Sequence, residues 1–271
     1  MDVKMDIEEL VSGYVGYLVN SFDEVWTQVK IPPDKLEAFS AIGGLLSRQV
    51  TLSIELAQAP SIWNGHSAPL FLRSMTDLYI TLAWMMDDLD ERPQKYVMHG
   101  LGEAKLLIEH YKLLLEKEEY QEDKEELQQM IDFREHWINS QRREFFVEVD
   151  VGTWSNLNCR KMAQEADCED LYNFAYTPFS QVAHSMWPHV SVYNMNRCKN
   201  PLHKHHLIPA LLEVPLDPDY LFRSCKYVDK TYRLFEKHFG VSIKQTPLDW
   251  WSSFWEAVPS EQSENEGSND A

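Results

Sequence analysis

The sequence lacks the features that mark secreted, membrane-spanning and nucleic-acid-coating proteins. Its 25 Lys and Arg are outnumbered by 43 Asp and Glu, and a net charge of −18 argues against an extended surface for nucleic acid or anionic lipid. The acidic start MDVKMDIEEL lacks the basic region and apolar run of a signal peptide, and no stretch approaches the roughly 18 apolar residues of a membrane span. We therefore expect a cytoplasmic protein with no membrane partner.

Signals for metals, disulfides and common catalytic motifs are scarce as well. The four cysteines stand at wide, irregular spacings without a C-x-x-C pair, which predicts buried free thiols. The cluster His203, Lys204, His205 and His206 lies in a proline-flanked loop without a carboxylate partner, so we expect no metal site and no cofactor. The chain contains no H-E-x-x-H, Walker, G-x-S-x-G or G-x-G-x-x-G motif, and the common enzyme classes receive no support.

Helical periodicity is frequent, whereas strand signals are few and the chain has only ten glycines. Asp34 is predicted to cap the second helix, and Gly240 is predicted to follow the end of a late one. The first predicted helix covers residues 5–30, the second about 25 residues after Asp34, and the third residues 69–86. The fourth begins at residue 93 and runs into a charged, solvated segment that ends at 127, and the fifth continues to 148. Later helices are predicted to begin at 167–170 and to cover 219–238 and 248–258.

Prolines and tryptophans mark the remaining segments. Pro178 and Pro188 predict a kinked or broken segment, and residues 196–218 predict a long loop that wraps the bundle. The last predicted helix has one apolar face, the Trp strip, formed by Trp250, Trp251, Phe254, Trp255 and Val258. We expect this strip to pack against the body, and a protein partner or a second copy of the chain is the alternative.

Together these patterns predict an all-α fold, a multi-helix bundle with a long Pro/His-rich loop and a C-terminal Trp-rich helix. Residues 1–258 are predicted to form a single helical domain with its core at residues 35–195. Residues 259–271 are predicted to form a disordered acidic tail.

Charged residues stand out on the third predicted helix, which is otherwise apolar. Arg73 and Asp77 are four residues apart and face the same way, where charges are costly unless they are paired. One interpretation is an intrahelical salt bridge that fixes the register of the bundle. The other interpretation is a polar site.

Two further polar stripes follow helical spacing. One is formed by Tyr176, Ser180 and His184, and the other by Tyr96, His99, Glu103 and His110. If their helices are neighbours, one interhelical pocket would combine acid, base and anion-binding groups from Arg73, Asp77, Glu103, Tyr176, Ser180 and His184. Histidines at such spacings are more often packing residues than catalysts.

The segments PLFLRSMTDLYITLAWMMDDLDERPQKYVMHGLGEAKLL and LYNFAYTPFSQVAHSMW resemble an uncharacterised bacterial all-helical family, domain of unknown function 5677. The resemblance covers about residues 35–195. The matching positions are Arg73 with Asp77, Asp88 with Arg92, and the Tyr176, Ser180 and His184 stripe. Asp77 stands where we expect Glu in this family. The resemblance implies a helical bundle and no established activity.

Two functional hypotheses follow. The first is a ligand-sensing or protein-interaction module, an effector or accessory of a bacterial stress or anti-phage defence system, with Tyr96, Tyr176 and Ser180 binding a small anionic ligand. The alternative is a metal-independent hydrolase, most plausibly a ribonuclease acting on RNA, since the bundle is similar to helical ribonucleases with an Arg and a nearby His on one helix. In this hypothesis His184 or His99 is the general acid or base, and Arg73 or Arg92 stabilises the developing phosphate charge. Asp77 or Glu103 orients these groups.

Overall fold

A computed structural model describes residues 7–117, 122–145 and 157–257 of the chain. Within these residues helices dominate, which confirms the predicted all-α fold, and no helix combines the length and apolar character needed to cross a membrane. The elements in chain order are α1 (Ile7–Thr27), α2 (Leu36–Ala57), the 3-10 turn η1 (Pro60–Ile62), α3 (Ala68–Met86), α4 (Arg92–Leu115), α5 (Lys124–Phe145), α6 (Cys159–Glu165), α7 (Glu169–Leu171), the π-helix η3 (Tyr172–Tyr176), α8 (Thr177–Ala183), α9 (Trp187–Tyr193), β1 (Met195–Arg197), β2 (Leu207–Pro209), α10 (Asp219–Phe239) and α11 (Pro247–Ala257).

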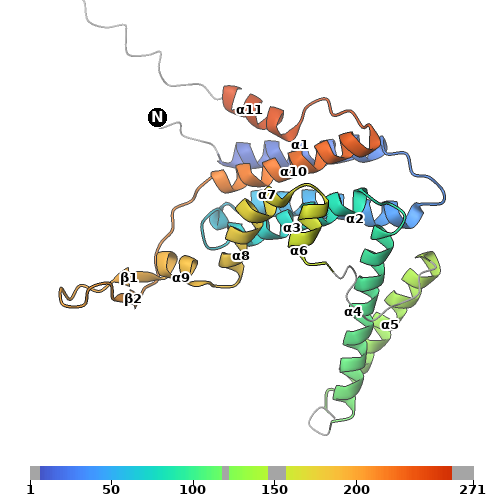
Figure 1. Cartoon of the computed structure of the whole chain (residues 1–271), viewed down its shortest axis with the longest axis horizontal. Helices are drawn as coiled ribbons and strands as arrows, with labels where there is room; N and C mark the ends of the chain where they lie inside the picture. The colour runs from blue at the N-terminus through green and yellow to red at the C-terminus, as the bar shows by residue number, and fades with distance from the viewer. Residues whose placement is uncertain (1–6, 118–121, 146–156, 258–271) are drawn as a thin grey trace, which may run out of the picture.

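Four long helices, α1, α2, α3 and α10, form the centre of the bundle, and α11 covers α1 and α10 (Figure 1). Each contributes fully buried side chains to one core, among them Tyr14, Ile42, Leu72 and Tyr232. Burial of one such side chain contributes about 1.5–3 kcal/mol, so this shared core holds the four helices together. The short helices α6, η3 and α8 pack on α3 and complete the bundle.

Hydroxyl groups inside the core connect helices that are distant in the sequence. The Tyr14 hydroxyl lies 2.9 Å from Ser53 Oγ, which lies 3.0 Å from Ser224 Oγ, and these bonds link α1, α2 and α10. Ser21 Oγ and the Tyr232 hydroxyl form a second link between α1 and α10, at 3.0 Å. A buried polar group without a partner costs about 1–3 kcal/mol, so these pairs favour one register of the helices.

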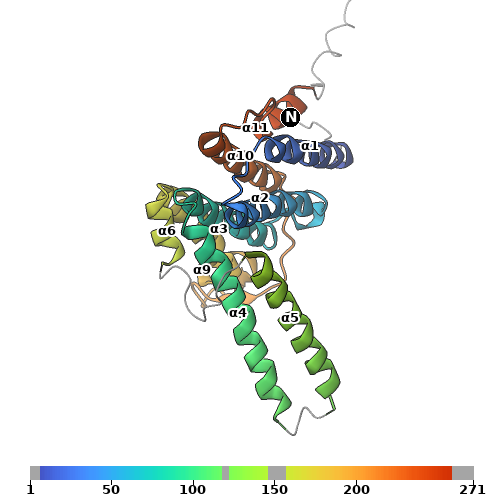
Figure 2. The ribbon, with the colours of Figure 1, turned by 90° about the vertical axis from the view of Figure 1, so that its right-hand side faces the viewer.

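Helices α4 and α5 form an arm that projects from the bundle (Figures 1 and 2). The base of α4 packs on α2, and α5 returns along α4. The seam between the two helices is a second hydrophobic cluster, formed by Leu101, Ile108, Ile131 and Ile138. The arm therefore has only a narrow core of its own, and much of its surface lies away from the bundle.

The predicted helix boundaries succeed in the core and fail at several ends. The helix predicted over residues 69–86 is α3, and Gly240 follows α10 with a left-handed φ of 67°. The predicted Asp34 cap is wrong, because Lys35 N donates to Pro32 O at 3.0 Å and the resulting turn delays the start of α2 to Leu36. The fourth helix ends at Leu115 instead of continuing through the charged segment, where like charges one turn apart disfavour a helix.

The prediction of a long loop that wraps the bundle is also wrong. Strands β1 and β2 pair as an antiparallel hairpin, with Asn196 opposite Ile208, and this hairpin extends away from the helices (Figure 1). The bond from Ala210 N to Asn194 O continues the pairing at 2.9 Å. In the hairpin the backbone N–H and C=O groups of the two strands bond to each other. In a loop that wrapped the bundle, the same groups would need partners on the helices. The chain then returns to the bundle at Asp217, whose N–H donates to Trp63 O at 2.8 Å.

The Trp strip on α11 packs against the body, as predicted. The Trp250 ring stacks on Tyr17 with centroids 5.6 Å apart and also lies 5.2 Å from the Tyr14 ring. The Trp251 ring lies 5.2 Å from Phe222 on α10. These contacts place α11 on α1 and α10. Val258 and the predicted acidic tail lie outside the described residues.

Candidate functional site

Residues from two of the predicted polar groups meet around Arg73 on α3. Its Nε donates to Ser180 Oγ at 2.6 Å, and its Cζ lies 3.3 Å from the centroid of the Tyr176 ring. Its Nη1 lies 3.6 Å from Asp77 Oδ2, so the predicted ion pair along α3 is present. Only 17% of the Arg73 side chain is exposed. Arg73 thus joins α3 to the segment that contains η3 and α8.

The π-helix η3 shapes this contact. It immediately precedes α8, and Pro178 lies in the first turn of α8. A π-helix adds a residue to one helical turn and is frequent at functional sites. Tyr176 and Ser180 contact Arg73 from either side of the junction, whereas His184 follows the end of α8 and is exposed. The structure therefore brings two members of the predicted stripe to Arg73 and places the third at a helix end.

A cysteine completes this cluster. Cys159, the first residue of α6, donates its thiol proton to Asp77 Oδ1 across 3.2 Å. Burial and the nearby Asp77 charge raise the pKa of Cys159 well above its usual value. Burial also raises the pKa of Tyr176 to about 12, and the proximity of Cys159 adds to that shift. Both groups are therefore protonated at neutral pH.

These protonation states and contacts limit the chemistry of the cluster. Asp77 already lies beside the Arg73 guanidinium, where an anionic ligand would otherwise bind. A thiol reacts as a nucleophile only as the thiolate, and Cys159 is held in the thiol form. The geometry fits a structural contact that holds α6 and α8 on α3 better than it fits a catalytic centre.

Arg92, the second predicted phosphate-binding arginine, makes a similar structural contact at the base of the arm. Its Nη1 donates to Trp84 O at 2.6 Å, and its Cζ lies 4.4 Å from the Trp84 ring centroid. Its Nη2 lies 3.4 Å from Glu165 Oε2, which also accepts from Trp84 Nε1 at 2.6 Å. Arg92 therefore connects the start of α4 with α3 and α6.

The other predicted stripe lies along the arm. Tyr96, His99 and Glu103 line a groove of about 510 Å³ at the base of the arm, where α2, α4 and α5 meet. Trp137 of α5 also lines this groove. Glu103 therefore faces the arm, whereas the contacts of Arg73 are with η3 and α8. The six-residue pocket expected from the sequence is divided between these two places.

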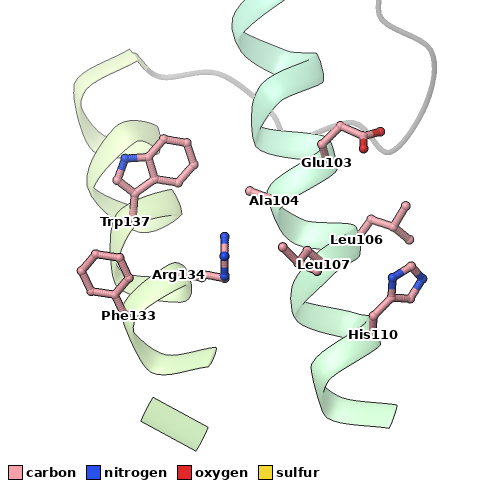
Figure 3. A pocket seen from close by; sticks show the side chains of 8 residues that line it. All are labelled: Glu103, Ala104, Leu106, Leu107, His110, Phe133, Arg134 and Trp137. Atoms are coloured by element: carbon pink, nitrogen blue, oxygen red, sulfur yellow. The ribbon is translucent and has the colours of Figure 1, made fainter. Parts of the chain in front are cut away.

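A larger groove of about 680 Å³ runs along one side of the arm (Figure 3). Its lining residues on α4 are Glu103, Ala104, Leu106, Leu107 and His110, and those on α5 are Phe133, Arg134 and Trp137. We call this side of the arm the arm face, and we include Met130, which is exposed one turn before Phe133. Figure 3 shows that Arg134 extends between the two helices toward α4. The exposed fraction is 73% for Phe133 and 43% for Trp137.

The opposite side of the arm is charged. Lys112 Nζ lies 2.9 Å from Glu135 on α5 and 3.3 Å from Glu109 on its own helix. Such exposed ion pairs contribute little stability, but they keep this side in water. The two sides of the same hairpin therefore differ, one suited to solvent and the other apolar and uncovered.

The α5 residues of the arm face and Cys159 are not among the site residues predicted from the sequence. Phe133 and Trp137 are four residues apart in a highly charged segment, and this spacing marks a helix face without indicating its exposure. Cys159 gives no local signal at all, because its partner Asp77 is 82 residues away. Cys198, His203 and His206 place potential metal ligands within 4.8 Å of one another.

Comparison with known proteins agrees with the resemblance found in the sequence. No curated protein and no solved structure matches the chain. A model of a family of unknown function, DUF5677, matches residues 39–201, from the start of α2 to the tip of the β-hairpin. This match covers more than half of the 271 residues and includes the Arg73 cluster and the whole arm. The chain therefore belongs to the DUF5677 family.

Proposed function

We propose that the protein is a protein-interaction module, and that its arm face docks against the arm face of a second copy of the chain. The observation that carries this proposal is the apolar groove with its exposed aromatic side chains, opposite a charged side of the same hairpin. A helical hairpin with one uncovered apolar side buries that side when a second hairpin packs on it.

The energy of such a contact is adequate for association. Full burial of an exposed Phe side chain contributes about 1.5–3 kcal/mol. Phe133 is 73% exposed and can gain most of this, whereas Trp137 is 43% exposed and can gain less than half of its burial energy, and each occurs twice in a symmetric pair. Aromatic residues at the centre of an interface commonly dominate its binding energy. Charge opposes the association, because each copy carries −18, so added salt is expected to tighten the dimer by screening the repulsion.

The arrangement of polar side chains favours a second copy in antiparallel orientation, because the His110 imidazole can donate a hydrogen bond to the Glu103 carboxylate. Glu103 and His110 lie about two turns apart on α4, at the two ends of the groove. An antiparallel two-fold pair of arms places Glu103 of each copy opposite His110 of the other, whereas a parallel pair places Glu103 opposite Glu103. Self-complementarity of this kind is what a two-fold interface requires. The product would be a four-helix bundle made from two arms.

Sedimentation equilibrium of the full chain tests the proposal. We expect a reversible dimer, and the substitution Phe133→Glu is expected to weaken it by about 2 kcal/mol or more, roughly thirty-fold in Kd. Val19→Glu is the matched control, because Val19 is an exposed apolar residue on α1. A wild-type chain that stays monomeric at all concentrations would contradict the proposal, as would equal weakening by Val19→Glu.

The hydrolase and anion-sensing hypotheses receive less support from the geometry. Arg73 and Arg92 each contact a carboxylate and an aromatic ring of the chain itself, and His184 lies at an exposed helix end. The groove lined by Tyr96 and His99 has a volume typical of small-molecule sites, which is the feature that favours ligand sensing. A role in bacterial stress or anti-phage defence stays a prediction.

A further inference from the structure

The β-hairpin brings together a thiol and two imidazoles that are separated in the sequence. Extending the register of β1 and β2 by one residue places Cys198 opposite His206, and Cys198 N donates to His206 O at 2.9 Å. Residues directly opposite in an antiparallel pair project from the same face of the sheet, with Cβ atoms about 4.5–5.5 Å apart. Cys198 and His206 therefore lie side by side where the hairpin loop begins.

The loop folds the third member onto this pair. His203 N donates to Asn200 O at 3.0 Å, and His206 N donates to His203 O at 3.2 Å, so two successive turns bring the chain back on itself. His205 adopts a left-handed φ of 63° within the second turn. As a result, His203 Nδ1 lies 3.6 Å from Cys198 Sγ, and the His203 and His206 rings lie 5.4 Å apart.

We propose that Cys198, His203 and His206 bind a Zn²⁺ ion. Their ligand atoms all lie within 4.8 Å of one another. Tetrahedral zinc with bonds of about 2.3 Å to sulfur and 2.0–2.1 Å to nitrogen separates those atoms by roughly 3.5 Å, so the Cys198–His203 distance already fits and His206 needs only a small movement. Thiolate and imidazole ligands select zinc over Mg²⁺ or Ca²⁺.

Three protein ligands leave the fourth position of the ion open. The chain from residue 195 to 212 carries Arg197, Lys199 and Lys204 and no acidic residue. The thiolate supplies one negative charge to a dication, and the neighbouring residues of the hairpin add cationic side chains but no carboxylate that could serve as a fourth ligand. Water or a small anion therefore completes the coordination. This site lies on the hairpin and is independent of the arm face.

Asn200 contacts His203 and sets its tautomer in the metal-free hairpin. Its Nδ2 donates to His203 Nε2 at 3.2 Å, which leaves the ring proton on Nδ1, while its Oδ1 accepts from Leu202 N at 3.0 Å. Metal binding at Nδ1 requires the ring proton on Nε2, where an oxygen must accept it. Asn200→Asp offers an oxygen to both donors and is therefore expected to tighten metal binding about tenfold.

Titration of the full chain with Co²⁺ and Zn²⁺ tests the site. We expect one Co²⁺ per chain with a thiolate-to-cobalt charge-transfer band, displacement by Zn²⁺, and release of the thiol proton to the buffer. Cys198→Ser is expected to abolish the band, and His203→Ala and His206→Ala are expected to weaken binding by ten-fold or more.

His205→Asn and Cys168→Ser are the matched controls, because each removes the same type of side chain outside the three proposed ligands, and asparagine tolerates the left-handed φ of position 205. Both are expected to bind Co²⁺ as the wild type does. Absence of a thiolate band in the wild type would overturn the proposal, as would its persistence in Cys198→Ser or equal weakening by His205→Asn.

Discussion

The Arg73 guanidinium lies over the Tyr176 ring, with Cζ 3.3 Å from the ring centroid, and donates through Nε to Ser180 on the next turn. One cation thus holds the junction between η3 and α8 on the apolar helix α3. A ring contact together with a separate hydrogen bond from Nε suits the planar, multidentate guanidinium of arginine, which lysine does not offer.

Removing this cation is expected to destabilise the fold. A partly buried cation–π contact contributes about 1–2 kcal/mol and a charge-assisted hydrogen bond about 1.5–3 kcal/mol, so Arg73→Ala should lower the free energy of unfolding by about 2.5–5 kcal/mol. Arg73→Lys should fall between this variant and the wild type. Urea unfolding at constant m-value measures the change. Arg48 is an exposed arginine on α2, and Arg48→Ala should change stability by less than about 0.5 kcal/mol. A similar effect of both alanine variants would contradict this assignment.

Alkaline pH is expected to destabilise the protein through Cys225. Burial raises the pKa of this thiol from 9.0 to about 12, and it donates to Pro247 O at 3.2 Å. Above pH 9 the unfolded chain releases this proton while the folded chain retains it, so stability falls as pH rises from 9 toward 12. Cys225→Ser removes the titration, and its stability should fall less steeply, by up to about 1.4 kcal/mol per pH unit. Urea unfolding between about pH 9 and 10 compares the slopes, and tyrosines, whose ordinary pKa is about 10, contribute to both proteins. Parallel slopes for the two proteins would contradict the prediction.

The sequence could predict contacts along one helix but not contacts between helices. The four-residue spacing of Arg73 and Asp77 defines their ion pair, and an apolar stretch with Pro69 near its start defines α3. Nothing in the spacing indicates that Tyr176, far along the chain, packs on Arg73. The same limit explains the divided pocket. Helical spacing places Glu103 with the other members of its own stripe, but it does not indicate whether Glu103 and Arg73 lie near each other.

Replacing Gly43 and Gly44 with alanine should change the stability of the fold in opposite directions. A Cβ on Gly43 would lie 2.6 Å from the Trp26 ring, whereas a Cβ on Gly44 meets nothing within 4 Å. Gly43→Ala therefore overpacks the contact between α1 and α2 and should destabilise by about 1–3 kcal/mol. Gly44→Ala should stabilise by about 0.5–1 kcal/mol, because alanine restricts the unfolded chain. Thermal unfolding distinguishes the two signs, and destabilisation by both variants would show that Trp26 is not the cause.

The register of the proposed arm dimer can be tested by exchanging charges. In the antiparallel pair, His110→Glu places the introduced carboxylate opposite Glu103 of the other copy, and two-fold symmetry creates the repulsion twice. Exposed charge pairs contribute up to about 1 kcal/mol each, so the dimer should weaken by about 1–2 kcal/mol, close to ten-fold in Kd. Adding Glu103→Lys restores opposite charges and should recover most of the affinity. A parallel pair would instead place the two introduced carboxylates opposite each other, and likewise the two introduced ammonium groups. The double variant would then recover no affinity over His110→Glu alone, because both proteins contain two like-charge pairs, and sedimentation equilibrium at low salt separates these two results.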